Sequence, residues 1–155
     1  MTNKFRFKYK GDIKDLEKLG NDVEKIMKEA LLEGANVAAD ALRSSSKGIK
    51  TADKYAWGNQ KRYASKTEKA ELLANMGYSP EGFKGNNIDR KAGFEGYTKK
   101  GMPIPKLANF INAGAGYQLK QPFIDTATTK AKKNARDKMN KKIEDEINKR
   151  VKKEG

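Results

Sequence analysis

The fold is decided by residues 12–45, which read DIKDLEKLGNDVEKIMKEALLEGANVAADALRSS. Apolar side chains recur in this stretch at spacings of three and four, the period of an amphipathic helix; they are Ile13, Leu16, Leu19, Val23, Ile26, Ala30, Val37, Ala38, Ala41 and Leu42. Gly20-Asn21 marks a break or kink, and the serines at 44–46 end the pattern. We therefore predict a helical region over 12–45. Its small residues at 34–41 allow a second element to approach closely.

A second helical pattern covers residues 122–153. Its apolar residues repeat every four positions: Ala127, Ala131, Ala135, Met139, Ile143, Ile147 and Val151. Each such step drifts by about 40° on a helix with 3.6 residues per turn, so we expect these positions to wind around the helix. Residues 126–153 would extend about 42 Å, the width of a compact chain of this size.

We therefore expect the C-terminal helix to reach along or beyond the body toward another subunit. A chain truncated after Lys130 should then stay folded but fail to assemble. The candidate interface residues are Lys132, Lys133, Arg136, Met139, Ile143, Ile147 and Arg150.

Three further segments complete the predicted fold. Aromatic and basic residues alternate over 3–10, which predicts a strand that serves either as a base-stacking platform or as ordinary sheet. Residues 47–105 hold most of the glycine and proline, and we interpret them as an irregular, loop-rich insertion with a short helix over 66–76 and a strand over 90–97. Residues 106–116 form an apolar segment, either strand or helix, and a glycine turn.

These elements predict one α+β domain over residues 1–155. A small, mainly antiparallel sheet would be packed by the long N-terminal helical region, and a long charged helix would follow at the C-terminus. The 155-residue length suits one domain and leaves little room for two.

The composition excludes most familiar enzyme chemistry. The chain has no cysteine and no histidine, so disulfides, thiolate nucleophiles, imidazole bases and His-ligated zinc are ruled out. The acidic run 144–146 lies among lysines at helical spacing and is typical of a solvated face, not a Mg²⁺ site. No apolar run approaches the roughly 20 residues of a membrane span, and residues 1–5 lack the apolar stretch of a signal peptide. We expect no catalytic residue, metal or cofactor, and synthesis in the cytoplasm.

Positive charge is the strongest compositional signal. The chain carries 34 Lys+Arg against 20 Asp+Glu, a formal net charge of +14. The C-terminal helix is especially rich in lysine and arginine. Such a helix can lie on a phosphate backbone or dock on an acidic protein partner.

Four short motifs in residues 92–127 resemble the tail-completion, or head–tail joining, proteins of long-tailed bacteriophages, of the gene-product-ten type. They are AGFEGY at 92–97, KGMP at 100–103, NFINAG at 109–114, and QPFI at 121–124 followed by Ala127. The signature residues are Gly93, Phe94, Gly96, Tyr97, Asn112, Gly114, Pro122 and Phe123.

The chain also departs from the family pattern. Asn112 and Ala113 stand where the family usually has Glu and an aromatic residue, and Ala115 stands for a Thr or Ser. The family's Asp-Thr-Gly segment after the first helix has no recognisable counterpart in residues 47–66.

The resemblance implies a structural virion protein of the phage neck, assembled in the bacterial host cytoplasm and located at the head–tail junction. Copies would form a ring, expected to be a hexamer, around the channel that DNA crosses without specific binding. The implied partners are the tail terminator, the tail tube and the head connector or stopper, and no membrane. The alternative hypothesis is a nucleic-acid-binding protein without sequence specificity.

Overall fold

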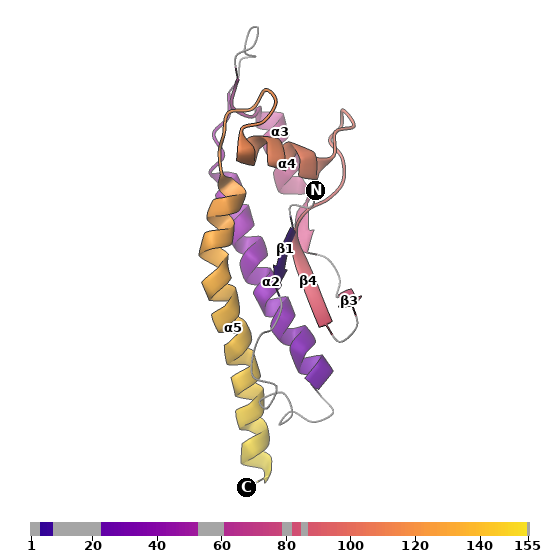
Figure 1. Ribbon diagram of the computed structural model, residues 1–155, viewed down its shortest axis with the longest axis vertical. Coiled ribbons are helices and arrows are strands. Elements are labelled where there is room, and N and C mark those ends of the chain that lie inside the picture. The colour runs from indigo at the N-terminus through magenta and orange to yellow at the C-terminus, as the bar shows by residue number, and fades with distance from the viewer. Residues whose placement is uncertain (1–3, 8–22, 53–60, 79–81, 85–86, 155) are drawn as a thin grey trace.

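The computed structural model describes residues 4–7, 23–52, 61–78, 82–84 and 87–154. The elements in chain order are β1 (Lys4–Phe7), α2 (Val23–Lys47), α3 (Lys66–Ala74), β2 (Met76–Tyr78), β3 (Gly82–Lys84), β4 (Asn87–Phe94), α4 (Ile104–Ala113) and α5 (Phe123–Glu154). Two long helices lie beside a small antiparallel sheet, and two short helices cover one end of the molecule (Figure 1). The predicted α+β class is confirmed.

Strand β4 is the centre of the sheet. Lys4–Phe7 of β1 pairs antiparallel with Arg90–Gly93, and β2 pairs antiparallel with Ala92–Phe94 on the path β1-β4-β2. Strand β3 pairs with the first residues of β4. The predicted strands are therefore present, but β4 covers 87–94 instead of 90–97, because a turn begins at Gly96 (φ +87°). Residue 3 and residues 8–10 of the other predicted strand, 3–10, lie outside the described residues.

Helix α2 is the structural centre of the chain. It contacts the sheet strands and also runs along α5. It ends at Lys47, two residues later than predicted, and the buried Ser46 hydroxyl donates a hydrogen bond to the Leu42 carbonyl in its last turn. The predicted helical segment 12–22, with its break at Gly20-Asn21, lies outside the described residues.

Helix α5 packs along α2 of the same chain in the antiparallel sense, so it runs along the body as expected. Its contact with another subunit stays a prediction. Five residues at four-residue spacing are buried: Ala127, Ala131, Ala135, Met139 and Ile143. The spacing does drift around the helix, but such i±4 rows form ridges inclined at about 26° to the axis. A partner helix that crosses obliquely can follow the whole row, and α2 runs obliquely to α5 (Figure 1).

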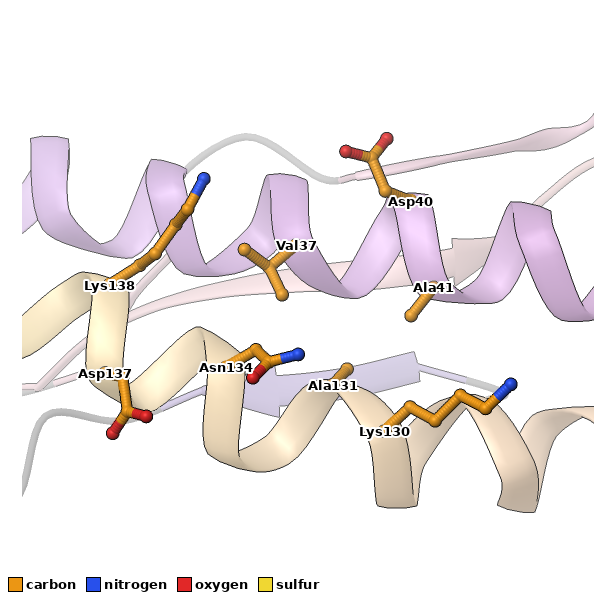
Figure 2. A pocket seen from close by; sticks show the side chains of 8 residues that line it. All are labelled: Val37, Asp40, Ala41, Lys130, Ala131, Asn134, Asp137 and Lys138. Carbon is orange, nitrogen blue, oxygen red and sulfur yellow. The ribbon is translucent and has the colours of Figure 1, made fainter.

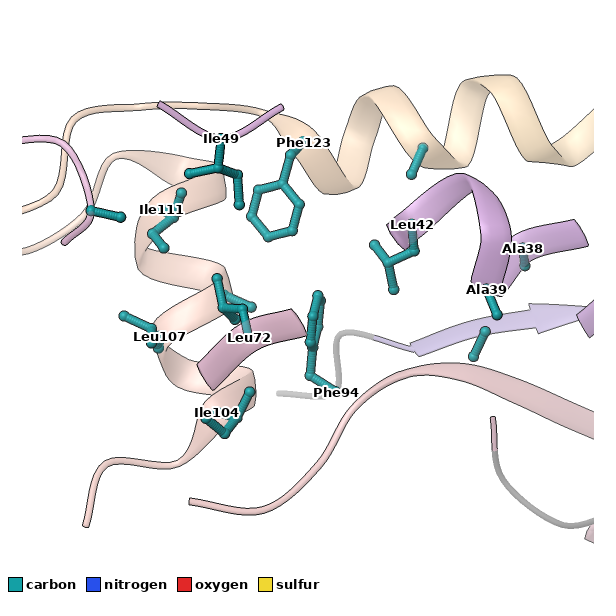
Figure 3. Packing of buried hydrophobic residues seen from close by; sticks show 14 of the residues in the cluster. Ala38, Ala39, Leu42, Ile49, Leu72, Phe94, Ile104, Leu107, Ile111 and Phe123 are labelled. Carbon is teal, nitrogen blue, oxygen red and sulfur yellow. The ribbon is translucent and has the colours of Figure 1, made fainter. Parts of the chain in front are cut away.

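Two apolar clusters form the core. The larger gathers side chains from α2, α3, β4, α4 and the start of α5, and Phe94 lies near its centre (Figure 3). The smaller lies farther along the helix pair and joins Ile26, Ala30 and Leu31 of α2 to Met139 and Ile143 of α5. Helix α2 contributes to both clusters and therefore connects the sheet and the short helices to α5.

The segment 47–105 is more regular than predicted, because two short strands accompany the expected helix and strand. The segment supplies α3, β2, β3 and β4. The predicted helix over 66–76 is present as Lys66–Ala74, started by Ser65, whose hydroxyl accepts a hydrogen bond from the Glu68 N–H. The short strands escaped prediction because three-residue strands carry too few positions to show a period.

The apolar segment left open between strand and helix is helix α4. Ile104, Leu107, Ala108 and Ile111 are buried, and their spacing of three, four and seven is helical. This helical spacing is visible only when Ile104 is included. Ile104 lies outside the segment 106–116 that the sequence analysis considered.

We predict that α2 and α5 tolerate no extra volume between them. Ala135→Leu places three additional carbon atoms in a fully buried position beside Gly34, and overpacking should destabilise the fold by about 2 kcal/mol. Urea unfolding monitored by circular dichroism measures this as a lower midpoint at unchanged slope. Asn140→Leu, at an exposed position on the same helix, is the control and should leave the midpoint nearly unchanged. Equal midpoints for the two variants would contradict the close packing.

We also predict that truncation after Lys130 unfolds the protein, the reverse of the sequence-based expectation. The truncation removes four buried residues, Ala131, Ala135, Met139 and Ile143, and exposes the α2 face that they cover. The check is the dispersion of amide signals in an NMR spectrum. A chain truncated after Lys149 keeps those residues and should remain folded. A dispersed spectrum for the shorter chain would show that α5 is dispensable.

Candidate functional site

Five of the eight signature residues lie at the junction of β4, α4 and α5: Phe94, Asn112, Gly114, Pro122 and Phe123. Phe94 ends β4 and Phe123 begins α5, and their rings meet edge to face with centroids 6.0 Å apart at 70°. Both side chains are buried (Figure 3). Ile124 packs half-buried against the same cluster, so Phe123 and Ile124 together anchor the start of α5.

Asn112 links α4 to the start of α5. Its Oδ1 accepts hydrogen bonds from the backbone N–H groups of Ile124 (3.0 Å) and Asp125 (3.3 Å). The first N–H groups of a helix have no partner within the helix, so a side chain from another element satisfies them here. Asn112 thus has a definite structural role at a position where the chain departs from the family pattern.

Gly114 makes the turn between the two helices. Its φ of +70° is left-handed, and it ends α4 with its N–H bonded to the Phe110 carbonyl. A Cβ at this residue would lie 2.9 Å from both the backbone N and the Cα of Lys120. Pro122 directly precedes α5, which begins one residue later than the predicted 122, and its carbonyl accepts a hydrogen bond from the Thr126 N–H.

Three signature residues belong to the end of β4 and the turn that follows. Gly93 lies inside β4, with Lys4 opposite on one side and Gly77 on the other. Gly96 has φ +87°, and its carbonyl accepts the N–H of Ile104. Tyr97 differs from the rest of the signature because its side chain is 71% exposed.

A polar cluster near α3 was not anticipated from the sequence. Arg62 Nη2 lies 2.6 Å from Glu68 Oε1, and the Gln118 side-chain amide donates to Glu68 Oε2 at 2.5 Å. The Arg62 guanidinium also lies over the Tyr117 ring, 4.7 Å from its centroid. The cluster attaches the loops that carry Arg62 and Gln118 to Glu68 of α3. The charges of Arg62 and Glu68 neutralise each other. The Ser-x-x-Glu pattern of Ser65 and Glu68 was the available signal.

The candidate interface residues of α5 divide into two groups. Met139 and Ile143 are buried against α2 of the same chain, and Ile147 is half-buried in the same cluster. They are therefore core residues, which corrects the interface prediction. Lys132, Lys133 and Arg136 are exposed, and the Arg150 side chain lies outside those that the structure describes.

The exposed cations between residues 130 and 141 point in several directions about the helix axis and so wrap around the solvent side of α5. We call this surface the basic face: Lys130, Lys132, Lys133, Arg136, Lys138 and Lys141. None of them has an ion-pair partner among the described residues, whereas Lys142 lies 3.5 Å from Glu29 and 3.4 Å from Glu146. The hydrogen bond with Glu146 raises the pKa of Lys142. Burial acts to raise the pKa of Glu146, but the hydrogen bonds from Lys149 and Lys142 outweigh it and lower that pKa.

The described residues contain no group of three or more Asp and Glu side chains placed to hold a metal ion. A membrane-spanning helix is likewise not found in that part of the chain. No protein-family model, curated protein or solved structure matches the chain. The signature residues and the basic face of α5 are therefore the features that bear on function.

We predict that the turn between α4 and α5 is stable only with glycine at position 114. Gly114→Ala combines a left-handed backbone with a clash against Lys120, and we expect a loss of about 2 kcal/mol in the free energy of unfolding. Gly101→Ala is a matched control, because Gly101 has φ +85° but no atom within 4 Å of the new Cβ. Chemical denaturation should show the larger loss for Gly114→Ala. Equal losses would mean that the turn has room for a side chain.

Proposed function

We propose that this chain is a structural subunit of the neck of a long-tailed bacteriophage, and not an enzyme. Copies form a ring, expected to be a hexamer, that completes the tail and joins it to the head around the DNA channel. The partners are the tail-terminator or tail-tube proteins on one side and the connector or stopper on the other. The protein is assembled in the bacterial host cytoplasm and resides in the virion.

The observation that carries this proposal is the convergence of the signature. The motifs are spread over residues 92–127 and belong to β4, the following turn, α4 and α5. Phe94 and Phe123 meet in the core, Asn112 caps α5 from α4, and Gly114 makes the turn between them. Because these motifs together build one junction, they support a fold shared with the neck proteins that the sequence resembles. A ring subunit acts through its shape and contacts, so a shared fold supports a shared function.

The basic face supports a role in docking. Six cations within 130–141 occupy about 17 Å of helix, share it with a single acid, Asp137, and form no ion pair with the described residues. Unpaired surface charge favours association with a surface of opposite sign. We place this face against acidic surfaces of the neighbouring rings, because a strongly basic channel wall would retard passing DNA. A weaker part of the charge can face the channel.

A second candidate function is nucleic-acid binding without sequence specificity, and the same basic face favours it. Binding to phosphates releases counterions, so affinity falls steeply as salt rises, with a slope of about −0.9 in log K against log salt per phosphate contact. A neck subunit should have little affinity for DNA at physiological salt. Salt dependence therefore separates the two candidates.

We predict that purified protein at physiological salt gives the same mass by light scattering with and without a short DNA duplex. A defined oligomer, or a monomer indifferent to DNA, agrees with the neck proposal. The monomer would mean that ring formation waits for the tail. A DNA complex that survives physiological salt would contradict the proposal and favour the second candidate.

The matched variants test the basic face. Lys132→Glu/Lys133→Glu/Arg136→Glu reverses three charges on that face, and Lys25→Glu/Lys50→Glu/Lys120→Glu reverses three exposed charges elsewhere. If DNA binds, only the first variant should lose more than about tenfold in affinity, since each lost phosphate contact lowers both affinity and salt slope. Equal losses would show that the total charge matters and not the face.

A further inference from the structure

Three loops lie together at the end of the molecule opposite the C-terminal end of α5: residues 48–52, 61–65 and 114–122 (Figure 1). These loops contain no aspartate or glutamate. Every exposed charged side chain on them is a lysine, and the last residue of α2 adds one more: Lys50, Lys61, Lys120 and Lys47. We call the three loops with Lys47 the three-loop surface. Because its exposed charge has one sign, it attracts an acidic partner and repels a basic one.

Backbone hydrogen bonds join the loops to one another. The Ala52 N–H donates to the Ala64 carbonyl (3.0 Å). The Arg62 N–H donates to the Tyr117 carbonyl (2.9 Å), and the Arg62 carbonyl accepts the Leu119 N–H (2.8 Å). The loops therefore keep a fixed arrangement, so little conformational freedom is lost when a partner binds.

Two side chains hold the loop that follows α2. The Gln121 side-chain amide accepts the Lys50 N–H (2.8 Å) and donates to the Lys50 carbonyl (3.1 Å). The Lys69 ammonium of α3 donates to the carbonyls of Lys47 (2.6 Å) and Ile49 (3.0 Å). The backbone that carries two of the four lysines is thus fixed from two directions.

The contacts between the loops also bring the backbones of the lysines together. The Lys61 ammonium donates to the Gly114 carbonyl, and a Cβ on Gly114 would lie 2.9 Å from the Lys120 backbone N. Lys120 directly precedes Gln121, which holds Lys50. Gly114 and Gln121 belong to the motifs NFINAG and QPFI, so two of the phage-like motifs gather these lysines.

Two acids border the three-loop surface, and both are engaged elsewhere. Glu68 lies 2.6 Å from the Arg62 guanidinium, and Asp125 accepts a hydrogen bond from the Asn112 side-chain amide (3.4 Å). Neither forms an ion pair with a lysine of the surface among the described residues. Tyr117 lies among these lysines, 39% exposed, with the Arg62 guanidinium over its ring. The surface therefore keeps its positive charge and adds an aromatic ring, a residue type that is enriched in protein interfaces.

The groove between α2 and α5 differs from this surface in its charge. Its volume is about 520 Å³, and charged side chains of both signs line it: Lys130, Lys138, Asp40 and Asp137 (Figure 2). Asp40 also forms an ion pair with Arg43, at 3.7 Å. Mixed charges do not select a partner by sign, whereas the three-loop surface does.

We propose that the three-loop surface is a second docking site, for a protein surface rich in aspartate and glutamate. The inference rests on the proposed neck function, in which this surface faces the ring that abuts its end of the subunit. Lysine ammonium groups are point charges that carboxylates approach from many directions. Arg62, whose planar guanidinium would suit a phosphate best, is held by Glu68 and Tyr117. The surface therefore favours carboxylates over a nucleic-acid backbone.

The test follows the backbone amide signals of the isotope-labelled protein by NMR during addition of a glutamate octapeptide. Salt is kept at about 50 mM, so that screening is weak. We expect saturable shifts for the three-loop surface, including the signals of the exposed Gly48 and Gly116. Binding curves read at these two signals report this surface alone, even where the peptide also binds the basic face of α5.

Matched charge reversals locate the binding. Three lysines of the surface are changed in Lys47→Glu/Lys50→Glu/Lys120→Glu, and we expect the affinity read at Gly48 and Gly116 to fall about tenfold or more. The control makes the same change in net charge at exposed positions elsewhere and should lower that affinity by less than about threefold; it is Lys25→Glu/Lys99→Glu/Lys100→Glu. The dispersion of the same spectra reports whether each variant is folded. Lys120→Gln alone should weaken binding by about threefold with least risk to the fold.

Three outcomes overturn the inference. The first is an absence of saturable shifts in the three loops of the unaltered protein. The second is an equal loss of affinity in the two triple variants, which would mean that total charge decides. The third is tighter binding of a single-stranded oligonucleotide with the same number of charges at these signals, because it would make a nucleic acid the partner.

Failure of this inference differs from failure of the neck proposal. A defined oligomer whose three-loop surface does not bind the peptide loses this docking site but keeps the neck function. Specific binding of the peptide, in a protein whose DNA complex on the basic face survives physiological salt, supports the docking site and contradicts the neck proposal.

Discussion

The close approach of α2 and α5 determines where the rest of the chain can lie. Met139 occupies the space above Gly34, where a Cβ would come within 2.6 Å of its sulfur. Farther along the pair, small residues face one another, with Ala131 and Ala135 on the α5 side. The larger side chains Leu31, Met139 and Ile143 fill the other part of the contact. Helix α2 is thus covered by α5 along one side and by the sheet along another.

The chain must reverse direction between β4 and α5, and the junction residues make those reversals rigid. Gly114 supplies a left-handed turn that a residue with a side chain adopts only under strain. Asn112 satisfies the first N–H groups of α5 from outside that helix. The start of α5 is thereby fixed to α4, so the direction in which α5 leaves the junction toward α2 is determined by hydrogen bonds as well as by apolar packing.

The apolar row of α5 is buried against α2 of the same chain, so it is not available for contact with a partner. The side chains left outside are mostly charged, and the cations of the basic face lack partners among the described residues. An interface built on α5 must therefore be polar at its rim and depend on salt.

The sequence by itself determined the local features: the helical periods of α2 and α5, the helix at 66–74, the strand character of β1 and β4, and the lack of cysteine and histidine chemistry. Each is a property of one segment or of composition. Only the tertiary structure decided which surface covers each apolar face. It placed Met139 and Ile143 in the core, made α4 a helix, and left Tyr97 in solvent. Periodicity states that a face must be buried, but the surface that buries it comes from residues far away in sequence, such as Gly34 beneath Met139.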